Sequence, residues 1–209
     1  MDILGTVFLI VIIIFSAIIH EVMHGFAADW LGDKTARYAG RLTLNPIPHI
    51  DPFGSILLPL VLALSGSPIF FAYAKPVPYN PYNLRPGRFS EAIVAGAGPA
   101  SNAVIALLGA LVIRSQVFAG ASDIIFLIVV VNVMLCIFNL IPIPPLDGSK
   151  VLEAFLPRSL QYGYDRWRRM MESTPLIGMV IVVIIILFLG DAFSNLIYSV
   201  AGALAGVSA

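Results

Sequence analysis

The chain has 209 residues, of which 59% are hydrophobic and 11% are charged, and its mean hydropathy is +0.94. Soluble domains carry about 25% charged residues, so this composition excludes an ordinary soluble protein and indicates an integral membrane protein. The formal net charge is zero, and a nucleic-acid partner is not expected because binding one would need a basic surface.

Apolar runs divide the chain into candidate membrane segments of about 20 residues, the length of helix that crosses a bilayer. They cover residues 3–28, 53–72, 92–113, 124–141 and 175–190, with a weaker run at 192–207. The pattern predicts an all-α polytopic membrane protein, a helical bundle of about 4–6 membrane segments. We expect a single domain over residues 1–209, with a catalytic core at 3–150 and C-terminal interfacial and membrane helices at 150–209.

Three polar stretches separate these runs. Residues 29–52 and 73–91 are rich in proline, asparagine and glycine, which favours turns and short extended segments over helices. Residues 147–173 instead predict interfacial helices that are interrupted at Pro157, with Trp167 among several arginines at the membrane surface.

The first apolar run ends in ionisable residues, which are expensive in a membrane and tend to mark functional sites. Residues 20–24 read His-Glu-Val-Met-His, and on a helix His20 and His24 share one face, so both imidazoles can reach one metal ion. Glu21 projects about 100° away from His20, because a helix has 3.6 residues per turn. This arrangement predicts a catalytic zinc site in which the Glu21 carboxylate takes a proton from the attacking water.

Catalytic zinc usually has three protein ligands, and Asp147 is the candidate for the third. It lies just beyond the run 124–141, after three prolines that end the helix. An Asp-Gly pair alone is typical of a surface turn, so the assignment of Asp147 depends on the histidine pair. The other acids beside apolar runs, Asp123 and Asp191, are expected at helix ends, in capping or boundary positions.

The two parts of this site can meet only if their helices cross the membrane in the same direction. His20 lies near the end of the first run and Asp147 just beyond the end of another, so an odd number of crossings must separate the two helices. Two runs intervene, and one of them must fail to cross. The run 53–72 contains Pro59 and a Ser-Gly-Ser-Pro break, and we predict that it is re-entrant.

The distribution of basic residues supports this topology. A re-entrant 53–72 places every lysine and arginine except Arg114 on one side of the membrane. Cytoplasmic loops carry an excess of these residues, so this side is expected to be the cytoplasm. We therefore expect a multi-pass protein of the cell membrane whose N-terminus is outside and whose site opens toward the cytoplasm.

The motif HEVMH, followed by NLIPIPPLDG on another apolar run, resembles the site-2 protease family of intramembrane zinc metalloproteases. The family's signature is H-E-x-x-H and then N-x-x-P-x-x-x-L-D-G, whose second part is matched by Asn139, Pro142, Leu146, Asp147 and Gly148. The segment GAGPASN at 96–102 resembles the start of the helix between the two ligand-bearing helices. The chain is similar to the compact prokaryotic branch that lacks PDZ and CBS domains.

The resemblance implies a membrane-embedded zinc metalloendopeptidase that hydrolyses peptide bonds in or near transmembrane helices of membrane-protein substrates. It implies that one Zn²⁺ per chain is bound by His20, His24 and Asp147, with Glu21 as the general base. Asn139 would lie near the site and orient the substrate or stabilise the oxyanion. The expected partners are transmembrane segments of substrates and the lipid bilayer, and no oligomeric state is indicated.

Two other functions are compatible with a metal site in a membrane. The first alternative is a non-proteolytic zinc-binding membrane protein that binds transmembrane partners, and the second is an ion transporter. A pure binder has no need of Glu21 as a base, and a transporter would carry further acids along its helices. Peptide-bond cleavage that depends on Glu21 separates the protease from both.

Overall fold

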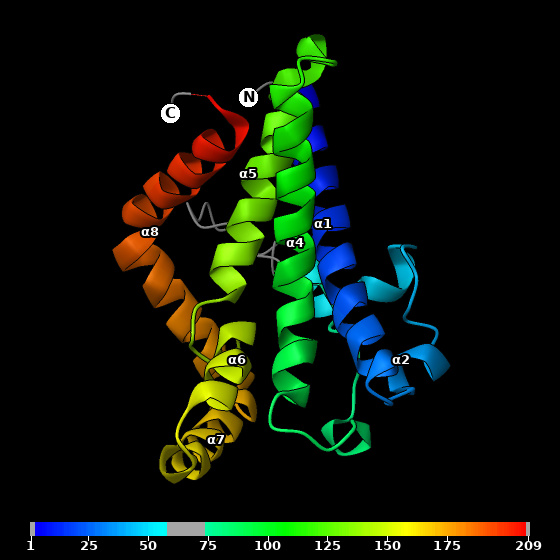
Figure 1. Cartoon of the computed structure of the whole chain (residues 1–209), viewed down its shortest axis with the longest axis vertical. Coiled ribbons are helices and arrows are strands. Elements are labelled where there is room, and N and C mark those ends of the chain that lie inside the picture. The colour runs from blue at the N-terminus through cyan, green and yellow to red at the C-terminus, as the bar shows by residue number, and fades with distance from the viewer. Residues whose placement is uncertain (1–2, 58–73, 208–209) are drawn as a thin grey trace. The chain divides into compact units, whose positions relative to one another are not determined.

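The computed structural model describes residues 3–57 and 74–207 of the chain (Figure 1). These residues contain seven α-helices and four short helical turns, and none of the described residues forms a strand. The expected all-α class is therefore confirmed. The chain forms two compact units, Met1–Arg85 and Pro86–Ala209, which are described in turn.

Four described helices are long and apolar enough to cross a membrane: Leu4–Trp30, Ser90–Arg114, Ser122–Asn139 and Phe188–Ala205. Together with the all-α class, they confirm a polytopic membrane protein built as a helical bundle. The predicted re-entrant segment at 53–72 falls largely on residues 58–73, outside the described residues, and it stays a prediction.

The first unit is organised around α1 (Ile3–Trp30), an unbroken apolar helix that carries the His-Glu-Val-Met-His motif in its last third. The helix ends before Gly32, whose φ of +113° is a backbone conformation that other residues rarely adopt. Short helical pieces follow, where the proline and glycine content favoured turns and extended segments over helices: α2 (Thr35–Tyr38), η1 (Ile47–His49), η2 (Pro52–Leu57) and η3 (Pro81–Asn83).

Asp33 joins the stretch that follows α1 to the stretch around residue 80. Its fully buried carboxylate accepts hydrogen bonds from the backbone N–H of Asn80 at 2.6 Å and the side-chain amide of Asn83 at 3.0 Å. Burial alone would raise the pKa of Asp33, but the hydrogen bonds from Thr35, Asn83 and Asn80 hold that pKa below its usual value. The ionised carboxylate is thus the anchor of this polar end of the unit.

The second unit contains three long helices, α4 (Ser90–Arg114), α5 (Ser122–Asn139) and α8 (Pro175–Ala205). Figure 1 shows α4 and α5 side by side, and α8 packs against both of them. Their shared core consists mainly of small and β-branched side chains: Ala106, Ala110, Ile113, Val129, Val133, Ile197, Ala201 and Ala205. Such residues let membrane helices approach closely.

A polar contact joins α4 to α5 within this apolar packing. The side-chain amide of Asn102 donates to Oδ1 of Asn132 at 2.9 Å, and Asn132 in turn donates to the carbonyl oxygen of Ile128. Both asparagines are fully buried. Hydrogen bonds of this kind fix the pairing of membrane helices, so Asn102 and Asn132 define how α4 and α5 are aligned.

The C-terminal runs 175–190 and 192–207 form one continuous helix, α8, of 31 residues. The expected helix boundary at Asp191 is therefore wrong, because this residue lies inside the helix. At 1.5 Å per residue α8 is about 46 Å long, which exceeds the roughly 30 Å hydrocarbon core of a bilayer. Such a helix either tilts or extends beyond the hydrocarbon.

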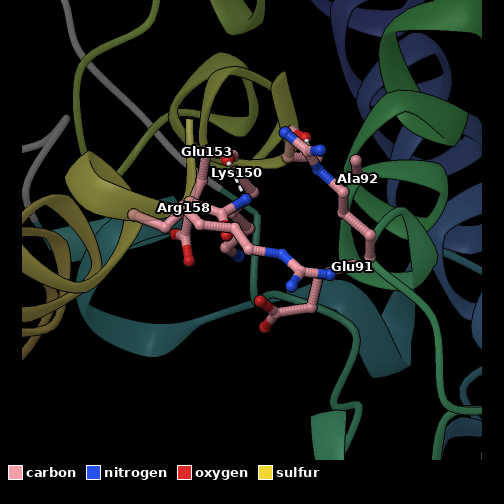
Figure 2. Close-up of a pocket in the computed structure, with 8 residues that line it drawn as sticks. Glu91, Ala92, Lys150, Glu153 and Arg158 are labelled. Atoms are coloured by element: carbon pink, nitrogen blue, oxygen red, sulfur yellow. Dashed lines mark hydrogen bonds between the residues drawn. The ribbon is translucent and has the colours of Figure 1, made fainter. Parts of the chain in front are cut away.

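The polar stretch after α5 forms α6 (Asp147–Phe155) and α7 (Arg158–Glu172), and the break between them lies at Pro157 as predicted. A cavity of about 250 Å³ lies between these helices and the start of α4 (Figure 2). Its lining mixes cations and carboxylates, including Arg88 and Glu153. Arg88 donates to the carbonyl oxygens of Ala154 and Leu156 and so attaches the end of α6 to the start of α4.

Arg168 of α7 completes this junction. Its buried guanidinium contacts Glu153 of α6 at 2.7 Å, Glu91 of α4 at 3.3 Å and Glu172 of its own helix at 3.2 Å. Burial alone would lower the pKa of Arg168, but Glu172, Glu91 and Glu153 raise it above its usual value. The ion pairs therefore stabilise the arrangement of α4, α6 and α7 that carries Asp147.

Candidate active site

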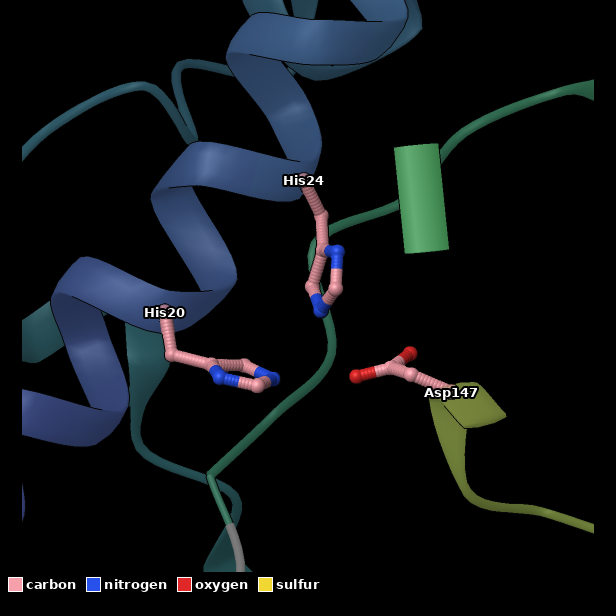
Figure 3. A group of neighbouring side chains, drawn as sticks. All are labelled: His20, His24 and Asp147. Atoms are coloured by element: carbon pink, nitrogen blue, oxygen red, sulfur yellow. The ribbon is translucent and has the colours of Figure 1, made fainter. Parts of the chain in front are cut away.

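His20 and His24 lie on successive turns of α1, with both side chains directed to the same side of the helix (Figure 3). The ring centroids are 4.6 Å apart and the ring planes are nearly perpendicular. A nitrogen of one ring lies within 4.8 Å of a nitrogen of the other. Two nitrogens on one zinc ion lie at most about 4.2 Å apart, so this spacing is compatible with both rings binding the same ion.

Glu21, between the two histidines, is held by a residue far along the chain. Its Oε2 accepts a hydrogen bond from the backbone N–H of Val77 at 2.9 Å. One carboxylate oxygen of Glu21 is therefore bound by the protein backbone. The role of Glu21 as the general base remains a prediction.

Gly25 follows the motif directly and explains how residue 77 approaches α1 so closely. A Cβ atom at Gly25 would lie 2.9 Å from Cγ1 of Val77, 2.6 Å from Cδ2 of Leu42 and 3.3 Å from Cβ of Ala36. Each separation is tighter than ordinary van der Waals contact. The absence of a side chain at Gly25 thus makes room for the segments that cover this face of α1.

Asp147 belongs to the second unit, where it is the first residue of α6 (Figure 3). The preceding helix α5 ends at Asn139, and the proline-rich stretch 140–146 separates the two helices, as predicted. A Cβ atom at Gly148 would fall within 2.6 Å of the carbonyl oxygen of Ile141 and would also meet the backbone of Leu140. Glycine at this position therefore lets the first turn of α6 lie against the end of α5.

Asn139 is the last residue of α5, and its side-chain amide donates to the carbonyl oxygen of Leu135 at 2.9 Å. This donor is used within its own helix, while the side-chain oxygen is the group that could contact a substrate amide. A role of Asn139 toward substrate or oxyanion remains a prediction.

The structure brings His20, Glu21 and His24 together in the first unit, and it places Asn139 and Asp147 around one helix junction in the second. The joint binding of one ion by residues of both units remains a prediction. Sequence reasoning missed Val77 as the partner of Glu21. The available signal was weak: residues 75–79 read Lys-Pro-Val-Pro-Tyr, in which Val77 alone between the two prolines keeps a backbone N–H.

Comparisons with known proteins agree with these features. Residues 112–185 match the model of peptidase family M50. The chain is 36% identical over 160 residues to "Putative zinc metalloprotease YwhC" of Bacillus subtilis, covering 72% of this chain and 69% of that protein. It is 31% identical over 202 residues to "Putative zinc metalloprotease Rip2" of Mycolicibacterium smegmatis, covering 92% of this chain and 73% of that protein.

No solved structure matches the chain at a significant level. The similarity to the two relatives extends over most of both sequences, and the family match includes the Asn139 to Gly148 motif. The chain therefore belongs to peptidase family M50, the site-2 protease family of metalloproteases.

Proposed function

We propose that this protein is a zinc-dependent intramembrane endopeptidase that hydrolyses peptide bonds in or near transmembrane helices of other membrane proteins. The observation that carries the proposal is the pair of imidazoles on one side of the apolar helix α1, with the Glu21 carboxylate between them in the sequence and bound by Val77. Family membership supports metalloprotease chemistry, and the apolar surroundings of the motif support a substrate that is itself in the membrane.

The proposed ligands of one Zn²⁺ per chain are His20, His24 and Asp147. Two imidazoles and a carboxylate form a donor set typical of catalytic zinc, with a further position left for the reactants. When bound, zinc supplies Lewis acidity that polarises a carbonyl and favours ionisation of water near neutral pH.

The protein's own groups carry the proton transfers. Glu21 accepts the proton of the attacking water at a carboxylate oxygen and then delivers it to the departing amine nitrogen of the substrate. Asn139 is proposed to contact the peptide being cleaved, either to orient it or to stabilise the negative charge that develops on its carbonyl oxygen.

The proposed orientation has the N-terminus outside the cell and the site open to the cytoplasm. This orientation rests on the distribution of basic residues and requires that residues 53–72 turn back. Hydrogen bonds between residues that flank this stretch support the re-entrant path. Lys75 donates from its backbone N–H to the carbonyl oxygen of His49 at 2.9 Å, and Arg85 likewise donates to Leu31. A re-entrant segment must begin and end on the same side of the membrane. Residues 49 and 75, which flank the predicted one, lie next to each other as this requires.

The Glu21→Gln variant tests the proposed function. Glutamine keeps the shape and hydrogen-bond acceptor of Glu21 but cannot take up the proton, so cleavage of a transmembrane peptide should fall by at least about 100-fold. Zinc content, measured by elemental analysis of the purified variant, should equal that of the wild type. Undiminished cleavage at equal zinc content would contradict the mechanism, and absence of cleavage by the wild type would favour the non-proteolytic alternative.

A further inference from the structure

The segment 75–79 offers one backbone N–H between Lys75 and Tyr79, and it is used on the carboxylate of Glu21. Both neighbours of Val77 are prolines, which have no N–H to donate. The Val77 N–H meets Oε2 of Glu21 at 2.9 Å. A simple surface turn has no need to bring its single donor to this carboxylate, which indicates a more specific role.

Arg41 fixes the two residues before Val77. Its Nη2 donates to the carbonyl oxygens of Lys75 at 2.8 Å and Pro76 at 3.3 Å, and its side chain is only 7% exposed. The N–H of Lys75 is bonded to the carbonyl oxygen of His49. The carbonyl oxygens and the N–H of this stretch are therefore hydrogen-bonded to residues of the same unit.

The other end of the segment is also fixed. The N–H of Asn80 donates to the buried carboxylate of Asp33, three residues after the end of α1. Val77 is itself buried, and it packs where Gly25 leaves room on α1. Anchoring on both sides holds the Val77 N–H at a defined place relative to Glu21, which could otherwise adopt several side-chain rotamers.

We propose that Val77, held by Arg41, positions the general base. The Val77 N–H restricts Glu21 by binding Oε2, which leaves Oε1 to exchange the proton with water and substrate. This inference rests on the proposed function, because it assigns a partner to the base of that same reaction. Groups that orient a reacting side chain contribute typically 10–100-fold to activity.

Val77→Pro removes the N–H, and Val77→Ala keeps it. The residue before Pro78 is biased toward extended conformations, a range that overlaps the backbone angles of proline, so proline is the substitution chosen to remove the N–H. Both variants lose the contact of the valine side chain with α1. We expect kcat of Val77→Pro to be at least about tenfold below that of Val77→Ala, with KM and zinc content equal in the two proteins.

Two further variants separate positioning from general stability. Tyr82→Ala alters a side chain that is 95% exposed in η3, shortly after the segment 75–79, and this variant should cleave like the wild type. Arg41→Ala should lower kcat, whereas Arg41→Lys keeps a donor for the carbonyl oxygens of residues 75 and 76 and should restore part of the loss. A purely structural role would instead lower thermal stability and zinc content together with activity.

Hydrogen exchange of the Val77 amide tests the contact without reference to activity. Exchange should be slow in the wild type and in Glu21→Gln, which retains an acceptor, and faster in Glu21→Ala. If the wild type cleaves and Glu21→Gln does not, equal kcat values for Val77→Pro and Val77→Ala overturn this inference alone. If Glu21→Gln cleaves as fast as the wild type, the proposed function fails and the inference fails with it.

Discussion

Two glycines, Gly25 and Gly148, each follow a proposed metal ligand directly, and packing explains why glycine stands at both positions. Gly25 follows His24 because Leu42 and Val77 lie where its side chain would be, and Gly148 follows Asp147 because the backbone of Leu140 and Ile141 lies there. Both glycines serve close packing next to a proposed ligand. Each proposed ligand is therefore followed by a residue whose small size is required by packing.

Replacement of Asp147 tests the third proposed ligand. Asp147→Ala leaves two imidazoles, so zinc affinity should fall by more than the roughly 10–100-fold lost when outer-shell partners are removed. Competition with a chelator, read out as zinc bound per chain, measures the effect. Asp123→Ala, which removes an exposed acid in the first turn of α5, should leave affinity unchanged. Equal affinities for both variants would remove Asp147 from the site.

At the scale of single residues, the sequence predicted contacts between residues that are close together in the chain. Residues four apart on a helix share a face, and His20 and His24 do so. The contact between Glu21 and Val77 could not be predicted, because it joins residues 56 positions apart and involves a backbone donor that every non-proline residue has. Side-chain patterns do not identify which such donor meets a given carboxylate.

Among the secondary-structure elements, the junction of α5 and α6 positions the second family motif. Alanine at Gly148 would force its Cβ against the backbone of residues 140 and 141, which cannot rotate away as a side chain can. We expect Gly148→Ala to lower the free energy of unfolding by about 1–3 kcal/mol and to weaken zinc binding, through displacement of the start of α6. Thermal unfolding in detergent and zinc titration measure the two effects.

Gly163→Ala is the matched control for this substitution. Gly163 lies in α7, and a Cβ atom added there would have no neighbouring heavy atom within 4 Å, so alanine meets open space. Alanine is also the better helix former by about 1 kcal/mol, and this variant should be as stable as the wild type or more stable. A destabilisation of Gly163→Ala equal to that of Gly148→Ala would contradict the role of close backbone packing.

Prediction of the elements succeeded where a residue with a strong local effect marks a boundary. Pro157 separates α6 from α7, and the prolines after Asn139 separate α5 from α6, as expected. The predicted boundary at Asp191 was wrong, and neither this residue nor Gly190 before it interrupts α8. In lipid an interrupted helix leaves backbone groups without hydrogen bonds, at a cost of several kcal/mol each, whereas glycine in a helix costs only about 1 kcal/mol.

Across the molecule as a whole, the described helices show a multi-pass membrane protein, and its proposed orientation follows from charge alone. All basic residues but Arg114 lie on the proposed cytoplasmic side only if residues 53–72 turn back. The sequence could not supply more than this, because a run with Pro59 and several small polar residues satisfies both a crossing and a re-entrant path. A single metalloprotease domain over 1–209 likewise stays a prediction beside the two compact units.

Cysteine accessibility tests this topology. In a Cys136→Ser background, single cysteines at Tyr38, Tyr82 and Phe118 occupy positions that are 84%, 95% and 60% exposed. Tyr38→Cys and Tyr82→Cys should both react with an impermeant maleimide from the cytoplasmic side, and Phe118→Cys from the outside. Reaction of the first two from opposite sides would show that residues 53–72 cross the membrane.

Cleavage of peptide bonds within the membrane is the property on which the proposed function depends. The position of the cut shows it directly, in a transmembrane substrate that is reconstituted with the enzyme in liposomes and analysed by mass spectrometry. We expect zinc-dependent products whose new ends lie in or beside the apolar segment and which are missing with Glu21→Gln. Products cut only in the soluble parts of the substrate, or identical products from Glu21→Gln, would contradict the proposed function.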